Sequence, residues 1–240
     1  MSDCAIVGHD GHRARAFLMR EGRLLDRAEG PGREAALAAL SARPDRVFHI
    51  GEGAPDSLPA ALLPGSPGRG LPGLTQDSPA DVLDGWVRLL LSGFAEARPD
   101  WDGVALVLTD QLSHWVHLSA REAVSCQSFL TPRLITALGG TLPADMDAIG
   151  DSLSRPERLA AHLRSAEVTG RADAISGHLI GAELAAARPY WLGQSVVLID
   201  GGASSAGHAG ALEAQGVPVS RYDPEVILSE ALAVLGERIG

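Results

Sequence analysis

The sequence predicts an α/β protein made of two related lobes, each beginning with a β-hairpin. In the first hairpin, "CAIVGHDG" and "RARAFLM" are apolar strands on either side of a glycine-containing turn. The same pattern returns later in the chain, where "GVALVLTD" and "HWVHLSA" flank a short polar turn. A third observation is "SVVLIDGG", a continuous apolar run that is typical of a buried parallel strand. Helical segments separate these strands, which favours the α/β class over an all-β fold.

The other elements of the first half follow in chain order. "RLLDRAE" predicts a third strand, "GREAALAALSAR" a helix that stops at Pro44, and "RVFHIG" another strand. Residues 53–80 are crowded with proline and glycine, so we expect an irregular connection there. An amphipathic helix is expected from Asp81 to Arg98, capped by Ser78-Pro79. We therefore place an N-terminal lobe at residues 1–104, including the 53–80 connection, and a C-terminal lobe at 105–240.

The second half is richer in helices. "AVSCQSFL" predicts a third strand beside the second hairpin, and "PRLITALGG" a short helix that ends at glycine. Residues 155–188 predict two helices. After the parallel strand, "SSAGHAGALEAQG" and "PEVILSEALAVLGERI" predict the last two helices.

Composition excludes several functional classes. The net charge is -10, and all 20 basic residues are arginine because the chain contains no lysine. Such a chain has no basic patch for nucleic acid or an anionic membrane, and it cannot use lysine chemistry. Its two cysteines, Cys4 and Cys126, offer neither a disulfide framework nor metal-ligand spacing. No signal peptide or membrane-spanning run is apparent, so a cytoplasmic location is expected.

Motifs in the same order along nearly the whole chain resemble the 2-dehydro-3-deoxygalactonokinase family. "ISGHLIGAELA" is similar to the family's "LSGLLIGAELA", and "SVVLIDGGASSAGHAGALEAQG" to its nucleotide-side strand and helix. "LTDQLSHWV" is similar to the family's "PGTHSKWV" hairpin, and "CAIVGHDGHRARAFLM" to its opening hairpin. "LPGLTQDSPADVL" resembles the approach to a "DVMRGEE" helix.

The resemblance implies a two-lobed actin-like, ribonuclease H-like ATPase fold and a sugar-acid kinase of galactonate catabolism. It implies ATP and Mg²⁺ as cofactors and a 2-keto-3-deoxy sugar acid as substrate. The implied nucleotide-binding residues are Gly177, Gly181, Glu183, Gly201 and Gly202. The implied phosphate-hairpin residues are Gly8, Gly11, Gln111 and Ser113. Candidate catalytic residues are Asp10, Asp110 and His114, and no metal ligand is assigned.

Several positions depart from the family's pattern. Gly8 stands where the family's first hairpin has the aspartate that holds Mg²⁺, and Asp10-Gly11 replaces its Gly-Thr. In the second hairpin Asp110 replaces a glycine and His114 replaces a lysine. The "RGEE" segment has become "DGWV" at residues 84–87, and the substrate loop after Ile50 is much shorter. Carboxylates at 10 and 110 would repel a polyanion unless a cation lay between them.

Three functions therefore stay open from the sequence. The first is a sugar-acid kinase. The second is an inactive homologue that binds a nucleotide, a metabolite or a protein. The third is a hydrolase that uses its Asp/His pairs. Residues His9, His12, His114 and His117 could form a metal or acid–base cluster, or could be ordinary surface and core-edge histidines. Gly177 and Gly181 could serve a ligand or close helix packing. A homo-oligomer is left open as a further partner.

Overall fold

The structure, a computed structural model, describes residues 3–66, 68, 70–200 and 204–239. Its contacts divide the chain into two units. The first unit comprises residues 1–101, 118–126 and 224–240, and the second comprises 102–117 and 127–223. The compact units are thus discontinuous in sequence, and the chain returns to the first unit for its final helix. The predicted lobes, 1–104 and 105–240, remain a prediction.

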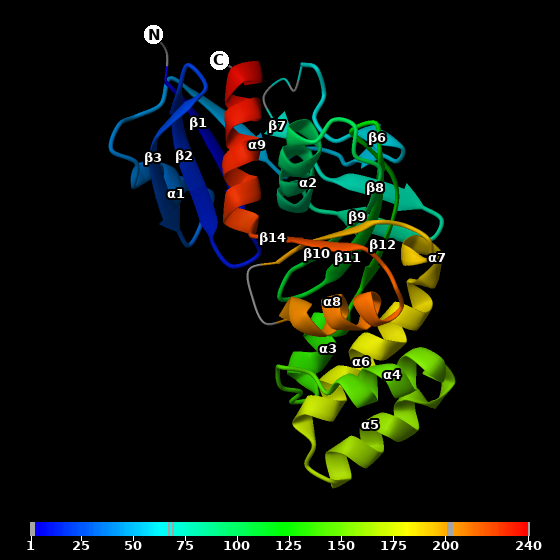
Figure 1. The fold of residues 1–240 in the computed structure, drawn as a ribbon. Helices are drawn as coiled ribbons and strands as arrows, with labels where there is room; N and C mark the ends of the chain where they lie inside the picture. The colour runs from blue at the N-terminus through cyan, green and yellow to red at the C-terminus, as the bar shows by residue number, and fades with distance from the viewer. Residues whose placement is uncertain (1–2, 67, 69, 201–203, 240) are drawn as a thin grey trace. The chain divides into compact units, whose positions relative to one another are not determined.

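The first unit contains a five-stranded sheet with the order β3-β2-β1-β4-β7. The strands are β1 (Cys4–His9), β2 (Ala14–Arg20), β3 (Arg23–Gly30), β4 (Arg46–Ile50) and β7 (Gly70–Leu71). β1 pairs antiparallel with β2 and parallel with β4 (Figure 1). The predicted first hairpin and the two strands after it are therefore confirmed.

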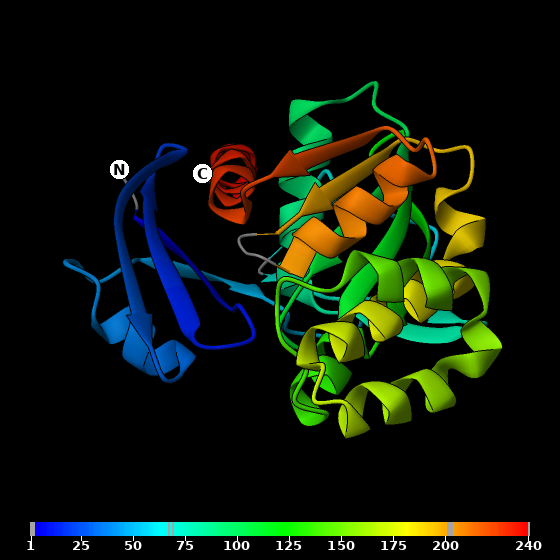
Figure 2. The ribbon, with the colours of Figure 1, turned by 60° about the horizontal axis from the view of Figure 1, so that its bottom comes forward.

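Helices contact the strands of this sheet. The short helix α1 (Arg33–Ala38) contacts β1, β2 and β3, and buries Ala36 with Val7 and Leu18. Helices α2 (Gly85–Ala97) and α9 (Pro224–Ile239) pack against each other and also touch the sheet (Figure 2). Gly93 allows this close approach, because a Cβ there would lie 2.5 Å from the Ile227 carbonyl oxygen.

The prediction for residues 53–98 needs two corrections. The supposedly irregular stretch contains β5 (Asp56–Ser57), β6 (Ala60–Ala61), β7 and β8 (Leu74–Asp77). The helix predicted from Asp81 begins only at Gly85, because residues 80–83 form strand β9 (Ala80–Leu83) antiparallel to β8. Asp84 is the helix N-cap, and its carboxylate accepts a hydrogen bond from the Val87 amide at 2.9 Å.

One buried arginine fixes the proline-rich stretch against helix α2. Arg88 donates to the carbonyl oxygens of Ala61, Leu62 and Pro72 at 2.8–3.0 Å. It also pairs with Asp56 at 2.7 Å. These contacts satisfy a guanidinium that is almost fully buried, and they anchor the carbonyl groups of the proline-rich stretch.

The second sheet repeats the arrangement of the first. Its strands are β10 (Gly103–Leu108), β11 (Ser113–Ser119), β12 (Glu122–Phe129), β13 (Val196–Ile199) and β14 (Val219–Tyr222), in the order β14-β13-β10-β11-β12-β6. β13 is parallel to both β10 and β14, as expected for a buried apolar strand. The division between the units runs through β11 and β12. Both sheets therefore begin with a hairpin and continue with parallel strands.

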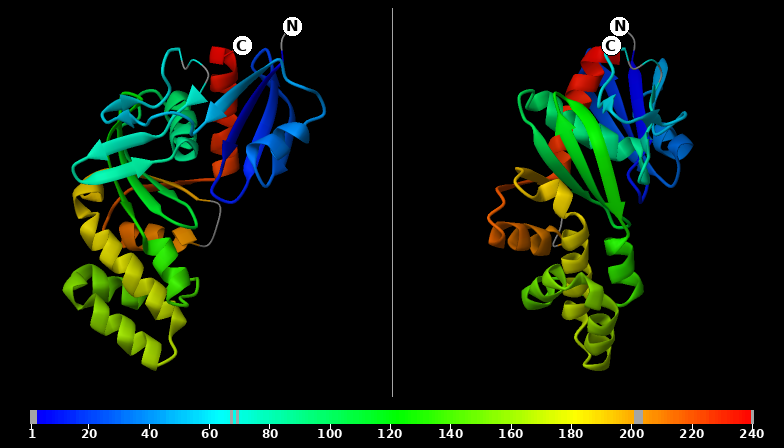
Figure 3. Two further views of the ribbon diagram at one scale, coloured as in Figure 1. Left: turned by 180° about the vertical axis from the view of Figure 1, so that it is seen from behind. Right: turned by 90° about the vertical axis from the view of Figure 1, so that its right-hand side faces the viewer.

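The second unit also contains a group of helices (Figure 3). They are α3 (Thr131–Ala137), α4 (Met146–Ser154), η1 (Pro156–Arg158), α5 (Leu159–Val168), α6 (Ala172–Ala186), α7 (Arg188–Trp191) and α8 (Ser204–Ala214). Helix α6 packs against both α4 and α5. The sequence did not predict α4 or β14. Within the described residues, every helix is too short or too polar to cross a membrane.

Candidate functional site

The turn of the first hairpin is closed by its own side chains. Asp10 Oδ1 accepts hydrogen bonds from the amides of His12 and Arg13, both at 2.9 Å. His9 Nδ1 accepts from the Gly11 amide at 3.1 Å. Partial burial by itself would raise the pKa of Asp10, but these two backbone donors hold it below its ordinary value. Backbone amides in such a turn are the donors that bind phosphate in other proteins, and here they already have partners.

The space beside Gly8 is also filled. A Cβ added to Gly8 would lie 2.8 Å from Ile50 Cβ and 3.1 Å from Trp86 Cε3. Trp86 stacks on Phe17 with ring centroids 6.4 Å apart. An aspartate at position 8 would therefore meet an apolar wall.

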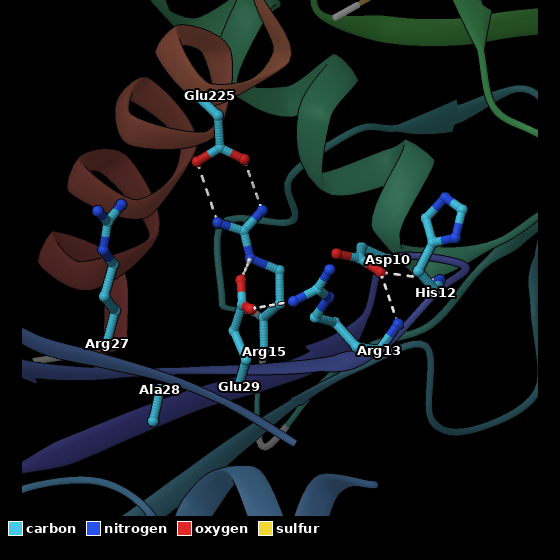
Figure 4. Close-up of a pocket in the computed structure, with 8 residues that line it drawn as sticks. All are labelled: Asp10, His12, Arg13, Arg15, Arg27, Ala28, Glu29 and Glu225. Atoms are coloured by element: carbon cyan, nitrogen blue, oxygen red, sulfur yellow. Dashed lines mark hydrogen bonds and ion pairs between the residues drawn. The ribbon is translucent and has the colours of Figure 1, made fainter. Parts of the chain in front are cut away.

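A polar cavity of about 640 Å³ lies beside this hairpin (Figure 4). The Arg15 side chain, which lines this cavity, is held in place by its contacts. It makes two hydrogen bonds to Glu225, at 2.6 and 3.0 Å, and packs on the rings of Phe17 and Trp86. Arg13 pairs with Glu29 at 2.6 Å. The lining residues are Asp10, His12, Arg13, Arg15, Arg27, Ala28, Glu29 and Glu225.

Sequence reasoning did not select Arg15 or Glu225. No local signal joins two residues that are 210 positions apart.

The turn of the second hairpin is closed in a similar way. Thr109 Oγ1 accepts hydrogen bonds from the amides of Leu112 at 2.9 Å and Gln111 at 3.3 Å, and donates to the Leu112 carbonyl oxygen at 2.9 Å. The Gln111 side chain accepts a hydrogen bond from Arg133 Nε at 3.1 Å. Thr109 was not among the predicted site residues, although threonine before a turn is a known local signal for such capping.

His114 lies inside the second unit and not at the tip of the turn. It is almost fully buried, and its Nδ1 is 2.7 Å from Ser128 Oγ. Ser113 is fully buried as well. Neither residue lines the cavity beside the second hairpin, whereas Asp110 and Gln111 do.

This second cavity has a volume of about 360 Å³ and mixed walls. It is lined by Leu108, Thr109, Asp110, Gln111, Thr131, Pro132, Ile135, Thr136, Leu142, Ile180, Asp200 and His208. Among the described residues, this lining contains two carboxylates, one histidine and no arginine. Asp200 Oδ2 accepts a hydrogen bond from the Ser205 amide at 3.1 Å, which places it at the start of helix α8.

A buried polar network lies behind His208. Glu183 Oε1 accepts hydrogen bonds from Trp115 Nε1 at 2.9 Å, and it lies 3.2 Å from His208 Nε2. Burial by itself raises the pKa of Glu183, but the attraction of His208 together with the hydrogen bonds that the carboxylate accepts lowers it below its ordinary value. Glu183 therefore joins hairpin strand β11 to helices α6 and α8, so the structure gives it a clear packing role.

The predicted nucleotide-binding glycines fall into two groups. A Cβ at Gly177 would lie 2.4 Å from the Asp145 carbonyl oxygen, and one at Gly181 would lie 2.3 Å from that of Ile149. Both glycines therefore allow α6 to pack closely against α4. Their nucleotide role remains a prediction. Gly201 and Gly202 lie outside the described residues.

The structure describes each hairpin within its own unit. Asp10, His9 and His12 belong to the first unit, and Asp110, His114 and His117 belong to the second. In the part of the chain that the structure describes, no group of three His, Cys, Asp or Glu side chains is arranged to hold a metal ion. The turn amides are occupied and Asp10 is bound to its own turn. The residues at these turns therefore do not fit the phosphates of Mg²⁺-ATP.

Comparison with solved structures identifies the fold. A Sinorhizobium meliloti protein that carries the provisional name 2-dehydro-3-deoxygalactonokinase matches with a TM-score of 0.80 and 22% identity, over 98% of each chain. Component A of (R)-2-hydroxyglutaryl-CoA dehydratase from Acidaminococcus fermentans matches with a TM-score of 0.55 and 12% identity, over 97% of this chain and 96% of that one.

The activator of 2-hydroxyisocaproyl-CoA dehydratase from Clostridium difficile, solved with bound ADPNP, matches with a TM-score of 0.54 and 10% identity. That match covers 98% of this chain and 94% of the activator. The fold is the mixed α/β actin-like ATPase fold, as predicted.

The model of the 2-keto-3-deoxy-galactonokinase family matches residues 154–235. That segment of the chain is therefore similar to the family. The matched segment contains the "ISGHLIGAELA" helix and the β13–α8 unit, so the resemblance inferred from those motifs is confirmed. No curated protein sequence matches the chain. The galactonokinase-related segment thus includes Glu183, Asp200 and His208, while both capped turns lie outside it.

Proposed function

We propose that the chain is a homologue of the sugar-acid kinases that binds a small molecule and transfers phosphoryl groups slowly or not at all. One observation supports this most strongly: five amides of the two hairpin turns, three in the first and two in the second, are already hydrogen-bonded to side chains of the same turns. Phosphoryl transfer depends mainly on positioning and charge stabilisation, and such turn amides supply part of both.

The lack of lysine adds to this argument. The phosphoryl group carries negative charge during its transfer, and cations stabilise that charge. By the sequence resemblance, His114 stands where the family has a lysine. That histidine is buried against Ser128. Losing one electrostatic donor typically lowers the rate by roughly a hundredfold to a thousandfold. The proposal keeps the cytoplasmic location and the absence of nucleic-acid and membrane partners that the sequence predicts.

An active sugar-acid kinase is the second candidate. The family match over residues 154–235 and the cavity beside the second hairpin favour it. On this alternative, 2-dehydro-3-deoxy-galactonate and Mg²⁺-ATP would be the substrates.

A coupled assay of ADP release separates the two candidates. The protein is incubated with ATP and 2-dehydro-3-deoxy-galactonate over a range of Mg²⁺ and Mn²⁺ concentrations. We expect turnover far below the roughly 1–100 s⁻¹ of typical kinases. A turnover number within that range, abolished by Asp110→Ala, would establish the kinase instead.

A further inference from the structure

Three polar side chains meet among the helices of the second unit, and none of them lines a hairpin cavity. Ser152 of α4, His162 of α5 and His178 of α6 form this histidine–serine cluster. Ser152 Oγ lies 3.2 Å from His162 Nδ1 and 2.9 Å from His178 Nδ1. Helix α6 packs against both α4 and α5 (Figure 1). One hydroxyl group therefore connects three helices.

The cluster is satisfied when its histidines are neutral. Ser152 has one hydroxyl proton and can donate it to only one Nδ1 atom, so the other Nδ1 carries a proton and donates to Oγ. Ser152 is fully buried and His178 is 8% exposed, so neither side chain can turn to water for a partner. The two ring centroids are 4.6 Å apart. Two protonated rings would place like charges side by side in this interior, so the packed arrangement favours at most one charged histidine.

The surroundings of His178 also favour its neutral form. Burial lowers the pKa of His178, and the neighbouring His162 lowers it further. Asp151 and Asp145 of α4 and a hydrogen bond to the Ala148 backbone act in the opposite direction without cancelling the shift. The other charged side chains of α4, η1, α5 and α6 lie at the surface or pair elsewhere; they are Asp147, Glu157, Arg158, Arg164, Glu167, Asp173 and Glu183.

The sign of the linkage follows from that lowered pKa. An unfolded histidine takes up its proton at about pH 6.5, whereas folded His178 takes it up only at a lower pH. The unfolded or opened state therefore binds more protons between these two values. The stability of the packed helices is complete above about pH 6.5 and decreases as the pH falls toward the folded pKa.

Helix α5 is sensitive to this change because its apolar contacts are small. Ala166 is its one buried residue, and Leu159 and Leu163 pack only partly on the small buried cluster around Ile175. Burial of so little apolar surface stabilises a helix weakly, and such elements open locally before the rest of a protein. The contact of His162 with Ser152 is therefore a substantial part of what holds α5 in place.

We propose that the histidine–serine cluster is a pH-sensitive contact that holds helix α5 at neutral pH and releases it on acidification. When both histidines are protonated, repulsion between their rings separates α5 from α4 and α6. The opening gives both imidazolium groups access to water and exposes Leu159 and Leu163. This inference is independent of the proposed function, since it concerns neither hairpin turn.

Hydrogen exchange of the backbone amides tests the inference. The full chain is exchanged at pH 7.5 and at pH 5.0, and each rate is divided by the intrinsic rate at that pH to give a protection factor. We expect protection of residues 159–168 to fall at least about tenfold at pH 5.0, because one pKa unit corresponds to a factor of ten. Protection of β11 should change by less than about threefold. No fall in α5, or an equal fall in β11, would overturn the inference.

Variants locate the response. His178→Leu removes the buried imidazole and should reduce the fall in α5 protection to less than about twofold. His162→Gln removes the other charge from a half-buried position and should also reduce the fall, so the inference stays testable if His178→Leu does not fold. His117→Gln, at a half-buried histidine of the same unit, is the matched control and should keep the full fall. A full fall in both cluster variants, or its loss in the control, would contradict the assignment.

Discussion

In the first hairpin, Asp10 and His9 accept the hydrogen bonds of three turn amides, and in the second hairpin Thr109 accepts two. The surroundings of the two turns differ more than the turns do. Three arginines and three carboxylates line the cavity of the first, whereas the described lining of the other has two carboxylates, several apolar side chains and no arginine. Equivalent hairpins in a repeated sheet can thus lose the same donors and still keep cavities of different chemistry.

The largest expected effect is a difference in stability loss between removing Glu183, which pairs with His208, and removing Glu225, which pairs with Arg15. Glu183 is fully buried, while the side chain of Glu225 is 55% exposed. Glu183→Ala should lower the free energy of unfolding by about 3–5 kcal/mol, because it removes one partner of a buried pair. Glu225→Ala should cost less, about 1 kcal/mol, because solvent screens the exposed Glu225 carboxylate, although its partner Arg15 is largely buried. Urea denaturation of both variants measures the difference, and equal losses would contradict the contrast.

The second effect tests whether the first hairpin can hold an aspartate at position 8. Gly8→Asp should destabilise the protein by roughly 3 kcal/mol, because its side chain would be forced against Ile50 and Trp86. Gly65→Asp is the matched control, since a Cβ at Gly65 meets nothing within 4 Å. Thermal unfolding and the ADP-release assay report on both. A stable Gly8→Asp variant with gained turnover would show that the site can be rebuilt.

A smaller effect is expected from removing the side chains that close the two turns, Asp10 in the first hairpin and Thr109 in the second. Thr109→Ala and Asp10→Ala should each cost about 1 kcal/mol of stability, as lost caps usually do. Thr109→Ser and Asp10→Asn keep an oxygen acceptor and should cost less. Chemical denaturation measures all four variants. If the alanine variants are as stable as their conservative partners, the side-chain bonds do not hold the turns.

The smallest expected effect is a dependence on pH of the stability that the Arg15–Glu225 pair contributes. Hydrogen bonding to Arg15 lowers the pKa of Glu225, so its folded pKa lies below the unfolded value of about 4.3. The stabilisation is therefore complete above that pH and is lost as the pH falls through the folded pKa. The stability difference between the natural chain and Glu225→Gln should vanish on acidification from about pH 6 to pH 2. A difference that stays constant would contradict this origin.

The sequence predicted the parts of the fold that depend on local pattern. Both hairpins, the parallel strand β13 and helices α6, α8 and α9 follow from apolar periodicity and glycine turns. The start of helix α2 was wrong because β9 is held by pairing with β8 and not by its own residues. The contacts Arg15–Glu225 and Glu183–His208 join distant segments, so no local signal shows them.

The amide signals of the two turns test the central claim most directly. Nitrogen-15 NMR of Gly11, His12, Arg13, Gln111 and Leu112 is recorded while Mg²⁺-ATP is added to millimolar concentration. If these amides are bonded to His9, Asp10 and Thr109, their shifts should stay unchanged in the natural chain. Saturable shifts at either turn would show that phosphate displaces the side-chain caps, and the claim that the turns are closed would be wrong.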